Sequence, residues 1–211
     1  MIQTAAVFLS LCCFVLFQGC SPTRSLVAND GSNRLIGNSL DGNITVVLTT
    51  NAWEGDSEIE RDFAVLHMLV HNRSPNPVLL APGDFDLIDE RGFRYMLQDS
   101  GGSFHRSDTN ASTNSEADPK DDIVASGRKS YDEGRHHHFD QTVSTSADFA
   151  RSALPWGVLL PGTQMRGYLY FEPIVRSANA ATLYWHSQTP DHQALTTFGF
   201  RLRITQSTSK S

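Results

Sequence analysis

The sequence has few cysteines, no apolar run long enough to span a bilayer, and no long segment of helical periodicity. Its three cysteines, Cys12, Cys13 and Cys20, lie within the first twenty of 211 residues, so the rest of the chain forms no disulfide and offers no thiol nucleophile. The uncharged apolar run at residues 5–17 has 13 residues, whereas a spanning helix needs about 20. A net charge of -6, with scattered Lys and Arg, argues against a nucleic-acid partner.

The short apolar run is typical of a secretory signal peptide, because small residues follow it at once. Phe17, Gln18, Gly19 and Cys20 resemble the lipobox of bacterial lipoproteins. The resemblance implies a signal peptide at residues 1–19, cleavage after it, and lipid attachment at Cys20, so that acyl chains hold the protein to a membrane. Ser21 after the cysteine resembles lipoproteins sent to the outer membrane. The alternative is a core strand or helix at residues 5–17.

The remaining chain has the length of one domain. Residues 20–42 are rich in Ser, Asn, Gly and Asp without a sustained period, which predicts a flexible tether between the lipid and the domain. Residues 43–206 are expected to form the domain, and residues 207–211 a disordered tail.

Alternating apolar and polar residues predict short strands through much of this domain. Residues 64–72, AVLHMLVHN, have two largely apolar faces, which indicates a central strand. Residues 197–205 place Phe198 and Phe200 on one face and Arg201 and Arg203 on the other. About seven or eight such strands, separated by turn residues, predict an all-β fold, an antiparallel β-sandwich.

Two stretches, residues 69–95 and 159–173, resemble the immunoglobulin-like domains of unknown function found in bacterial and archaeal surface lipoproteins. The matching positions are Asn72, Pro77, Val78, Phe85, Leu87, Asp89, Gly92 and Tyr95 in the first stretch, and Leu160, Pro161, Gly162, Gly167 and Phe171 in the second. They are turn residues and inward apolar residues. The resemblance therefore implies an immunoglobulin-like sandwich and no catalytic residues.

Residues 99–152 interrupt the strand pattern with a long polar insertion. They hold ten acidic and six basic residues, so -4 of the net charge of -6 lies there. An interval of this length exceeds ordinary loops, which predicts either disorder or a function. Within it, residues 146–154 predict a short helix, with Ser146 as N-cap and Pro155 as the stop.

The insertion also contains the one stretch with the composition of a metal site, DEGRHHHFD at residues 132–140. In an extended backbone His136 and His138 point the same way about 6.6 Å apart, and Asp140 lies close by. Further ligands would come from Asp132, Glu133 or His105. The alternative is a solvated polar loop that binds no metal.

Two further groups of residues, a pair of histidines and a set of mainly aromatic side chains, are candidates for packing contacts or for recognition of a partner. His67 and His71 are about 13 Å apart on a strand, too far to share an ion, and are expected to be packed or hydrogen-bonded. Adjacent Met68 faces the other side and is expected in the core. Tyr168, Tyr170, Tyr184 and His186 are a candidate aromatic face for a protein or glycan, unless a second sheet or the insertion covers them.

No nucleophile elbow and no zinc-protease motif occurs in the sequence, so we expect no enzyme and no cofactor. The prediction is a lipid-anchored protein of the cell envelope, on the periplasmic face of the outer membrane or the cell surface. It would act as a non-catalytic binding or structural module with an envelope protein or glycan as partner. The alternative function is metal binding through His136, His138 and Asp140.

Overall fold

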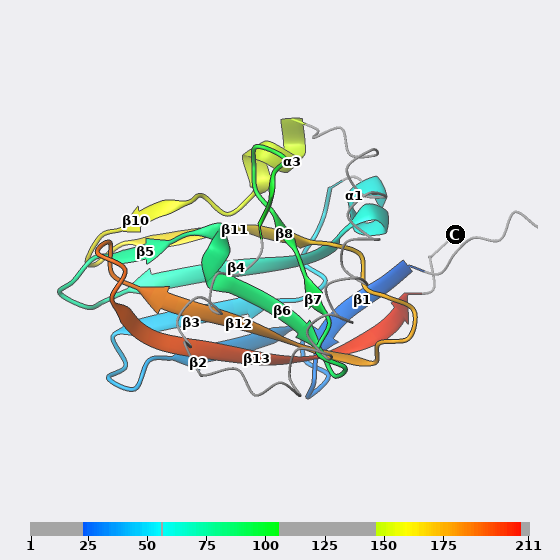
Figure 1. Cartoon of the computed structure of the whole chain (residues 1–211), viewed down its shortest axis with the longest axis horizontal. Coiled ribbons are helices and arrows are strands. Elements are labelled where there is room, and N and C mark those ends of the chain that lie inside the picture. The colour runs from blue at the N-terminus through cyan, green and yellow to red at the C-terminus, as the bar shows by residue number, and fades with distance from the viewer. Residues whose placement is uncertain (1–22, 56, 106–146, 208–211) are drawn as a thin grey trace, which may run out of the picture.

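The computed structural model describes residues 23–55, 57–105 and 147–207 (Figure 1). The predicted signal peptide, Cys20 and most of the polar insertion lie outside the described residues. None of the described helices is long and apolar enough to cross a membrane.

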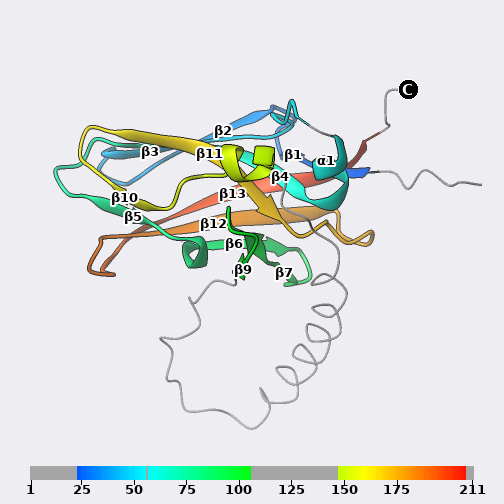
Figure 2. The same ribbon diagram turned by 90° about the horizontal axis from the view of Figure 1, so that it is seen from above.

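Two antiparallel sheets pack face to face as the layers of a sandwich (Figures 1 and 2). Sheet A contains β1 (Thr23–Ala28), β13 (Ala194–Ser207), β12 (Ala180–Gln188), β5 (Val78–Leu80), β10 (Gly157–Leu159), β6 (Phe85–Asp89) and β7 (Arg94–Tyr95). Sheet B contains, in spatial order, β2 (Arg34–Asn38), β3 (Ile44–Thr49), β4 (Ala64–Asn72), β11 (Gln164–Phe171), β8 (Leu97–Gln98) and β9 (Phe104–His105). The predicted all-β, immunoglobulin-like antiparallel sandwich is confirmed.

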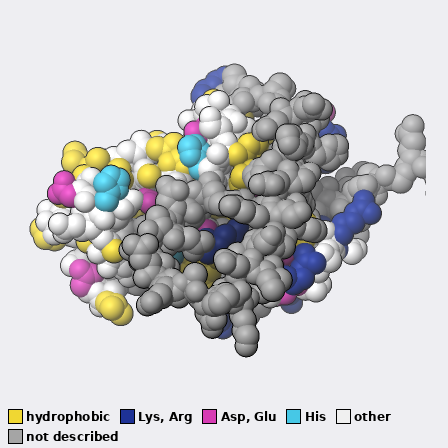
Figure 3. All heavy atoms as spheres, viewed as in Figure 1, with side chains coloured by type: hydrophobic (Ala, Val, Ile, Leu, Met, Phe, Trp, Pro, Cys, Tyr) yellow, Lys and Arg dark blue, Asp and Glu magenta, His cyan; other side chains and the backbone are white. Residues whose placement is uncertain are grey.

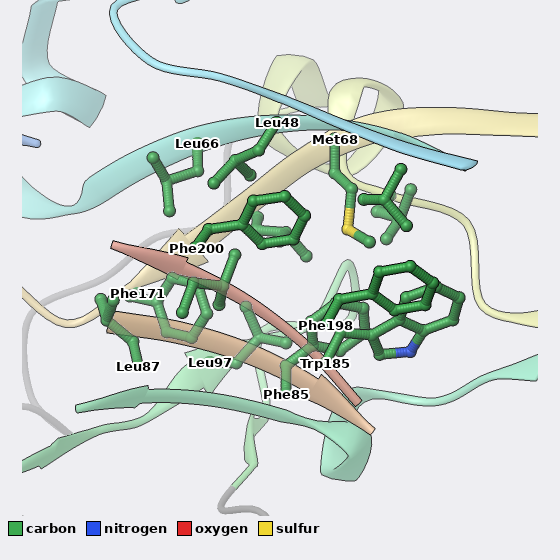
Figure 4. Packing of buried hydrophobic residues seen from close by; sticks show 14 of the residues in the cluster. Leu48, Leu66, Met68, Phe85, Leu87, Leu97, Phe171, Trp185, Phe198 and Phe200 are labelled. Carbon is green, nitrogen blue, oxygen red and sulfur yellow. The ribbon is translucent and has the colours of Figure 1, made fainter. Parts of the chain in front are cut away.

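The core lies between the inner faces of the two sheets. Residues of β4 alternate strictly between buried and half-buried, because the strand is central in sheet B between β3 and β11. Met68 is fully buried, which confirms its predicted place in the core. Figure 4 shows it facing the aromatic side chains that sheet A contributes. Trp185 stacks there on Phe198 with ring centroids 5.2 Å apart, and burying each such side chain contributes about 1.5–3 kcal/mol.

Turn residues in the two stretches that carry the family resemblance hold the ends of strands. The buried amide of Asn72 donates to the carbonyls of Asn76 (2.8 Å) and Leu159 (3.1 Å), which ties the end of β4 to β10. Asp89 accepts from the backbone N–H groups of Arg91 (2.9 Å) and Phe93 (2.8 Å), so its carboxylate shapes the turn between β6 and β7. Both side chains have a structural role.

The segment predicted as a flexible tether contains two strands, which corrects that prediction for residues 23–38. β1 pairs with β13 along its whole length and buries Leu26 and Ala28. β2 pairs with β3, and Gly37 lets it pass close to the rings of Phe198 and Phe200. Each strand has only five or six residues, so the Ser, Asn and Gly of the turns around them obscure the alternation. The sandwich thus includes residues 23–38, and β13 continues to residue 207.

Two short helices, α1 (Ser57–Asp62) and α3 (Ala147–Ser152), pack on part of the outer face of sheet B. α3 confirms the helix expected within residues 146–154, whereas α1 was not predicted. The helices bury Ile59 and Phe149 against Tyr170 of β11 in a second small core. β9 and α3 also show that the interval 99–152 contains regular structure at both of its ends.

Candidate binding surface

The predicted lipid and metal sites cannot be compared with the fold, because Cys20, His136, His138 and Asp140 lie outside the described residues. The further candidate ligand His105 lies on β9, where its Nε2 is 2.7 Å from Oδ2 of Asp99. This contact helps to keep the pKa of Asp99, which burial would raise, below its usual value. The part of the chain that the structure describes has no cluster of three metal-binding side chains.

The four residues proposed as one aromatic face lie on two different sheets, so this prediction is wrong. Tyr168 and Tyr170 belong to β11 of sheet B, whereas Tyr184 and His186 belong to β12 of sheet A. Tyr170 is fully buried and stacks on Phe149 with centroids 4.1 Å apart, and burial raises the pKa of its hydroxyl. The outer face of β11 around Tyr170 is therefore packed beneath the helices and is no open platform.

His67 and His71 have the packed or hydrogen-bonded roles that the sequence predicts. The rings of His67 and Tyr168 form a T-shaped contact with their centroids 5.1 Å apart. Burial, with smaller effects from Arg166 and Arg34, lowers the pKa of His67. Arg73 Nε donates to Nδ1 of His71 across 3.3 Å.

A polar cluster lies instead on the outer face of sheet A, centred on Asp86. Asp86 is 4% exposed, and its Oδ1 accepts from Nη1 of Arg94 at 2.7 Å. Its Oδ2 lies 3.4 Å from Nε2 of His186. The other ring nitrogen, Nδ1 of His186, is 3.1 Å from the hydroxyl of Thr197. One buried carboxylate thus fixes a guanidinium and an imidazole beside it, each 31% exposed.

The register of three strands brings these side chains together. β12 pairs with β6 on one side and β13 on the other, so Tyr184 lies opposite Asp86 and also opposite Gly199. An added methyl group at Gly199 would lie 3.4 Å from the Tyr184 ring, which shows how closely the ring approaches this position. The rings of Tyr184 and His186 are nearly parallel, 18° apart, with centroids separated by 6.3 Å.

A second buried carboxylate extends the cluster toward the far end of β12. Asp84 lies in the short 3-10 helix η1 (Pro82–Asp84), and its Oδ1 accepts from Nε2 of Gln188 at 2.6 Å. Burial raises the pKa of Asp84 despite this hydrogen bond. We call this set the Asp86 surface. It consists of Asp84, Asp86, Arg94, Tyr184, His186, Gln188 and Thr197.

The Asp86 surface has the chemistry of a recognition site. It combines an aromatic ring with fixed donors and acceptors on a paired sheet, which holds their positions better than a loop does. Sequence reasoning identified Tyr184 and His186 but missed Asp86 and Arg94. The available signal was the alternation in residues 85–89, where Phe85 and Leu87 point inward and Asp86 between them points outward.

No family model and no curated protein matches the chain. Among solved structures, the chain is similar to a secreted protein from Mycobacterium tuberculosis, MPT63, with 10% identity and a TM-score of 0.32. The match covers 80% of this chain and 94% of that one. A likeness this low carries no argument about function.

Proposed function

We propose that this protein is a lipid-anchored component of the cell envelope that acts as a non-catalytic binding module. The observation that carries the anchor is the string of Phe17, Gln18, Gly19 and Cys20, which ends three positions before β1 begins at Thr23. Lipidation at Cys20 would leave the folded part intact, because every described element lies after it. The location would be the periplasmic face of the outer membrane or the cell surface.

The Asp86 surface supports the binding role. Tyr184 supplies a flat apolar ring, while Arg94 and His186 supply polar groups that the Asp86 carboxylate already orients. Side chains held in this way lose little conformational freedom when a partner binds, which favours affinity. An envelope protein or a glycan has the hydrogen-bonding groups and flat faces that such a surface would recognise.

Mass analysis of the N-terminus tests the anchor. The expressed wild-type protein should begin at Cys20 and carry acyl groups, because the lipobox directs both steps. Cys20→Ser should lack the acyl mass and leave the membrane fraction. A mature wild-type chain that retains residues 1–19 with an unmodified Cys20 would contradict the anchor.

A pair of histidine variants tests the binding surface. His186→Ala removes a ring from the Asp86 surface, whereas His71→Ala removes a ring from the outer face of sheet B. The wild-type protein should capture envelope proteins or envelope glycans. His186→Ala should reduce this capture at least tenfold, since one hot-spot side chain contributes about 2 kcal/mol or more, whereas His71→Ala should leave it unchanged. Equal capture by both variants would place the binding site elsewhere.

A further inference from the structure

One edge of sheet B, formed by β2, has the features of a pairing site for another strand. β2 pairs with β3 along its whole length without a register shift, and within the described residues it is the last strand of the sheet on that side. Its outward side chain Ile36 is 63% exposed. A regular edge strand with an exposed apolar side chain is a template for pairing with a further strand.

The other edges of the two sheets are short or covered. β7 and β9 have two residues each. β10 has three, and its Leu159 carbonyl already accepts from the amide of Asn72 at 3.1 Å. β1 has six residues, but α1 contacts it and none of residues 24–28 is exposed. Among the described strands, β2 therefore presents the longest uncovered edge.

The backbone groups of β2 alternate between β3 and this edge. Ser39 and Ile44 extend the register of the ladder by one pair, and Ser39 N–H donates to the Ile44 carbonyl at 2.9 Å. Hydrogen-bonded and non-bonded pairs alternate in an antiparallel ladder. The N–H and C=O groups of Gly37 therefore face β3, whereas those of Ile36 and Asn38 point away from it and can pair with another strand.

An apolar row on the outer face of sheet B ends at the same edge. Ile36 lies opposite Val47, and Val47 lies opposite Leu69. Val47 and Leu69 are half-buried, whereas Ile36 is exposed. Because residues that pair directly share a face of the sheet, a strand added beyond β2 would place one of its own side chains beside Ile36 and continue the row.

We propose that a second copy of this chain occupies the edge, through antiparallel pairing of β2 with β2 about a two-fold axis at Ile36. This register sets the two Ile36 side chains next to each other, so the apolar rows of both copies join into one. It also places Arg34 opposite Asn38 of the partner subunit, so no like charges face each other. The edge is thus complementary to itself, as a two-fold interface requires.

The backbone can form the hydrogen bonds of this register. The two Ile36 residues would exchange their N–H and C=O groups, and Asn38 N–H would donate to the Arg34 carbonyl of the partner subunit. The Arg34 carbonyl already accepts from the Ser32 hydroxyl at 2.9 Å, but a carbonyl oxygen has two lone pairs. The Arg34 N–H is 3.4 Å from Ser32 Oγ, a long contact that pairing would replace.

The pairing uses no residue of the Asp86 surface, which lies on sheet A. A pair of chains would therefore present two such surfaces, and a ligand with repeated units would bind both at once with higher avidity. The pairing itself depends neither on the lipid anchor nor on the binding role of the Asp86 surface. An interface built on one short strand is small, so we expect a reversible dimer.

Analytical ultracentrifugation tests the dimer. The chain from residue 20 onward, with Cys20→Ser, contains no cysteine and keeps every described element. Its average mass should rise from monomer toward dimer between about 1 µM and about 1 mM. Ile36→Lys should weaken the dimer at least about tenfold, because it sets two like charges directly opposite each other at the axis.

The matched control is Leu160→Lys. Leu160 is 58% exposed, but it follows β10 of sheet A, in the region around β5 and β10 where Figure 3 shows hydrophobic side chains. This variant should dimerise like the parent chain, and thermal unfolding should show that both lysine variants are folded. A dimer that persists in Ile36→Lys, or is weakened equally by both substitutions, would overturn the proposed edge.

Cross-linking by mild oxidation tests the register. In the cysteine-free parent chain, Ile36→Cys would place two thiols on a hydrogen-bonded pair with Cα atoms about 5.5 Å apart, within the reach of a disulfide. It should form linked dimers at least about tenfold faster than Leu160→Cys. Equal rates would contradict the register. A parent chain that stays monomeric at about 1 mM would overturn the dimer and leave the edge to an extended segment of a different protein.

Discussion

At the scale of single residues, Gly167 shows why a position of the family pattern resists substitution. It lies on β11, and a methyl group added there would be 2.4 Å from Cα of Leu154, which belongs to the backbone after α3. Leu154 N–H donates to the carbonyl of Tyr168 at 2.8 Å, so this segment is held against the strand. The absence of a side chain at residue 167 permits the contact.

Gly167→Ala should therefore lower the free energy of unfolding by about 1–3 kcal/mol, since the backbone must move to relieve the overlap. Urea unfolding measures this change. Gly199→Ala is the matched control, because its methyl group would make an ordinary contact of 3.4 Å with the Tyr184 ring. A loss of stability that is equal in the two variants would show that Leu154 yields easily.

At the scale of elements, β1 and β2 form part of the sandwich, although the sequence predicts a flexible tether for these residues. β1 forms the edge of sheet A and β2 the edge of sheet B. Both strands contribute inward side chains that are few and widely spaced in the sequence. β1 pairs with β13, far along the chain, and β2 pairs with the neighbouring β3 but packs close to Phe198 and Phe200. A local pattern of five or six residues contains little of that long-range information.

Leu26→Ala tests whether β1 contributes to stability. Leu26 is 3% exposed, so its truncation should cost about 2–5 kcal/mol in the free energy of unfolding. Leu40→Ala lies in the same predicted tether, but Leu40 is 105% exposed, and its change should stay within about 0.5 kcal/mol. Chemical denaturation of both variants gives the comparison. Equal stabilities would restore the original expectation of a tether.

At the scale of the whole molecule, the outer faces of the two sheets differ in the side chains that they expose. Part of the outer face of sheet B, around Tyr168 and Tyr170, is occupied by α1, α3 and the aromatic side chains beneath them. The outer face of sheet A carries charged and polar side chains along its length, from Arg203 to Gln188. The proposed binding surface follows from this difference, because the Asp86 surface lies on the outer face of sheet A.

The sequence by itself determined the class of fold and the positions of its strongest strands. Alternation in β4, β12 and β13 is a local property, since successive side chains of any strand point to opposite faces. The turn positions Asn72 and Asp89 were equally readable, because their side chains bond to backbone groups within four residues. The order of the residues also shows where the acidic charge lies along the chain.

Only the tertiary structure decided which side chains meet. Tyr168 and Tyr184 look equivalent in the sequence, yet one lies under helices on sheet B and the other beside Asp86 on sheet A. Asp86 and His186 are a hundred residues apart in the chain, and Arg24 and Ala178 are separated by 154. Strand order and register create these contacts, and both depend on how the whole chain buries its core.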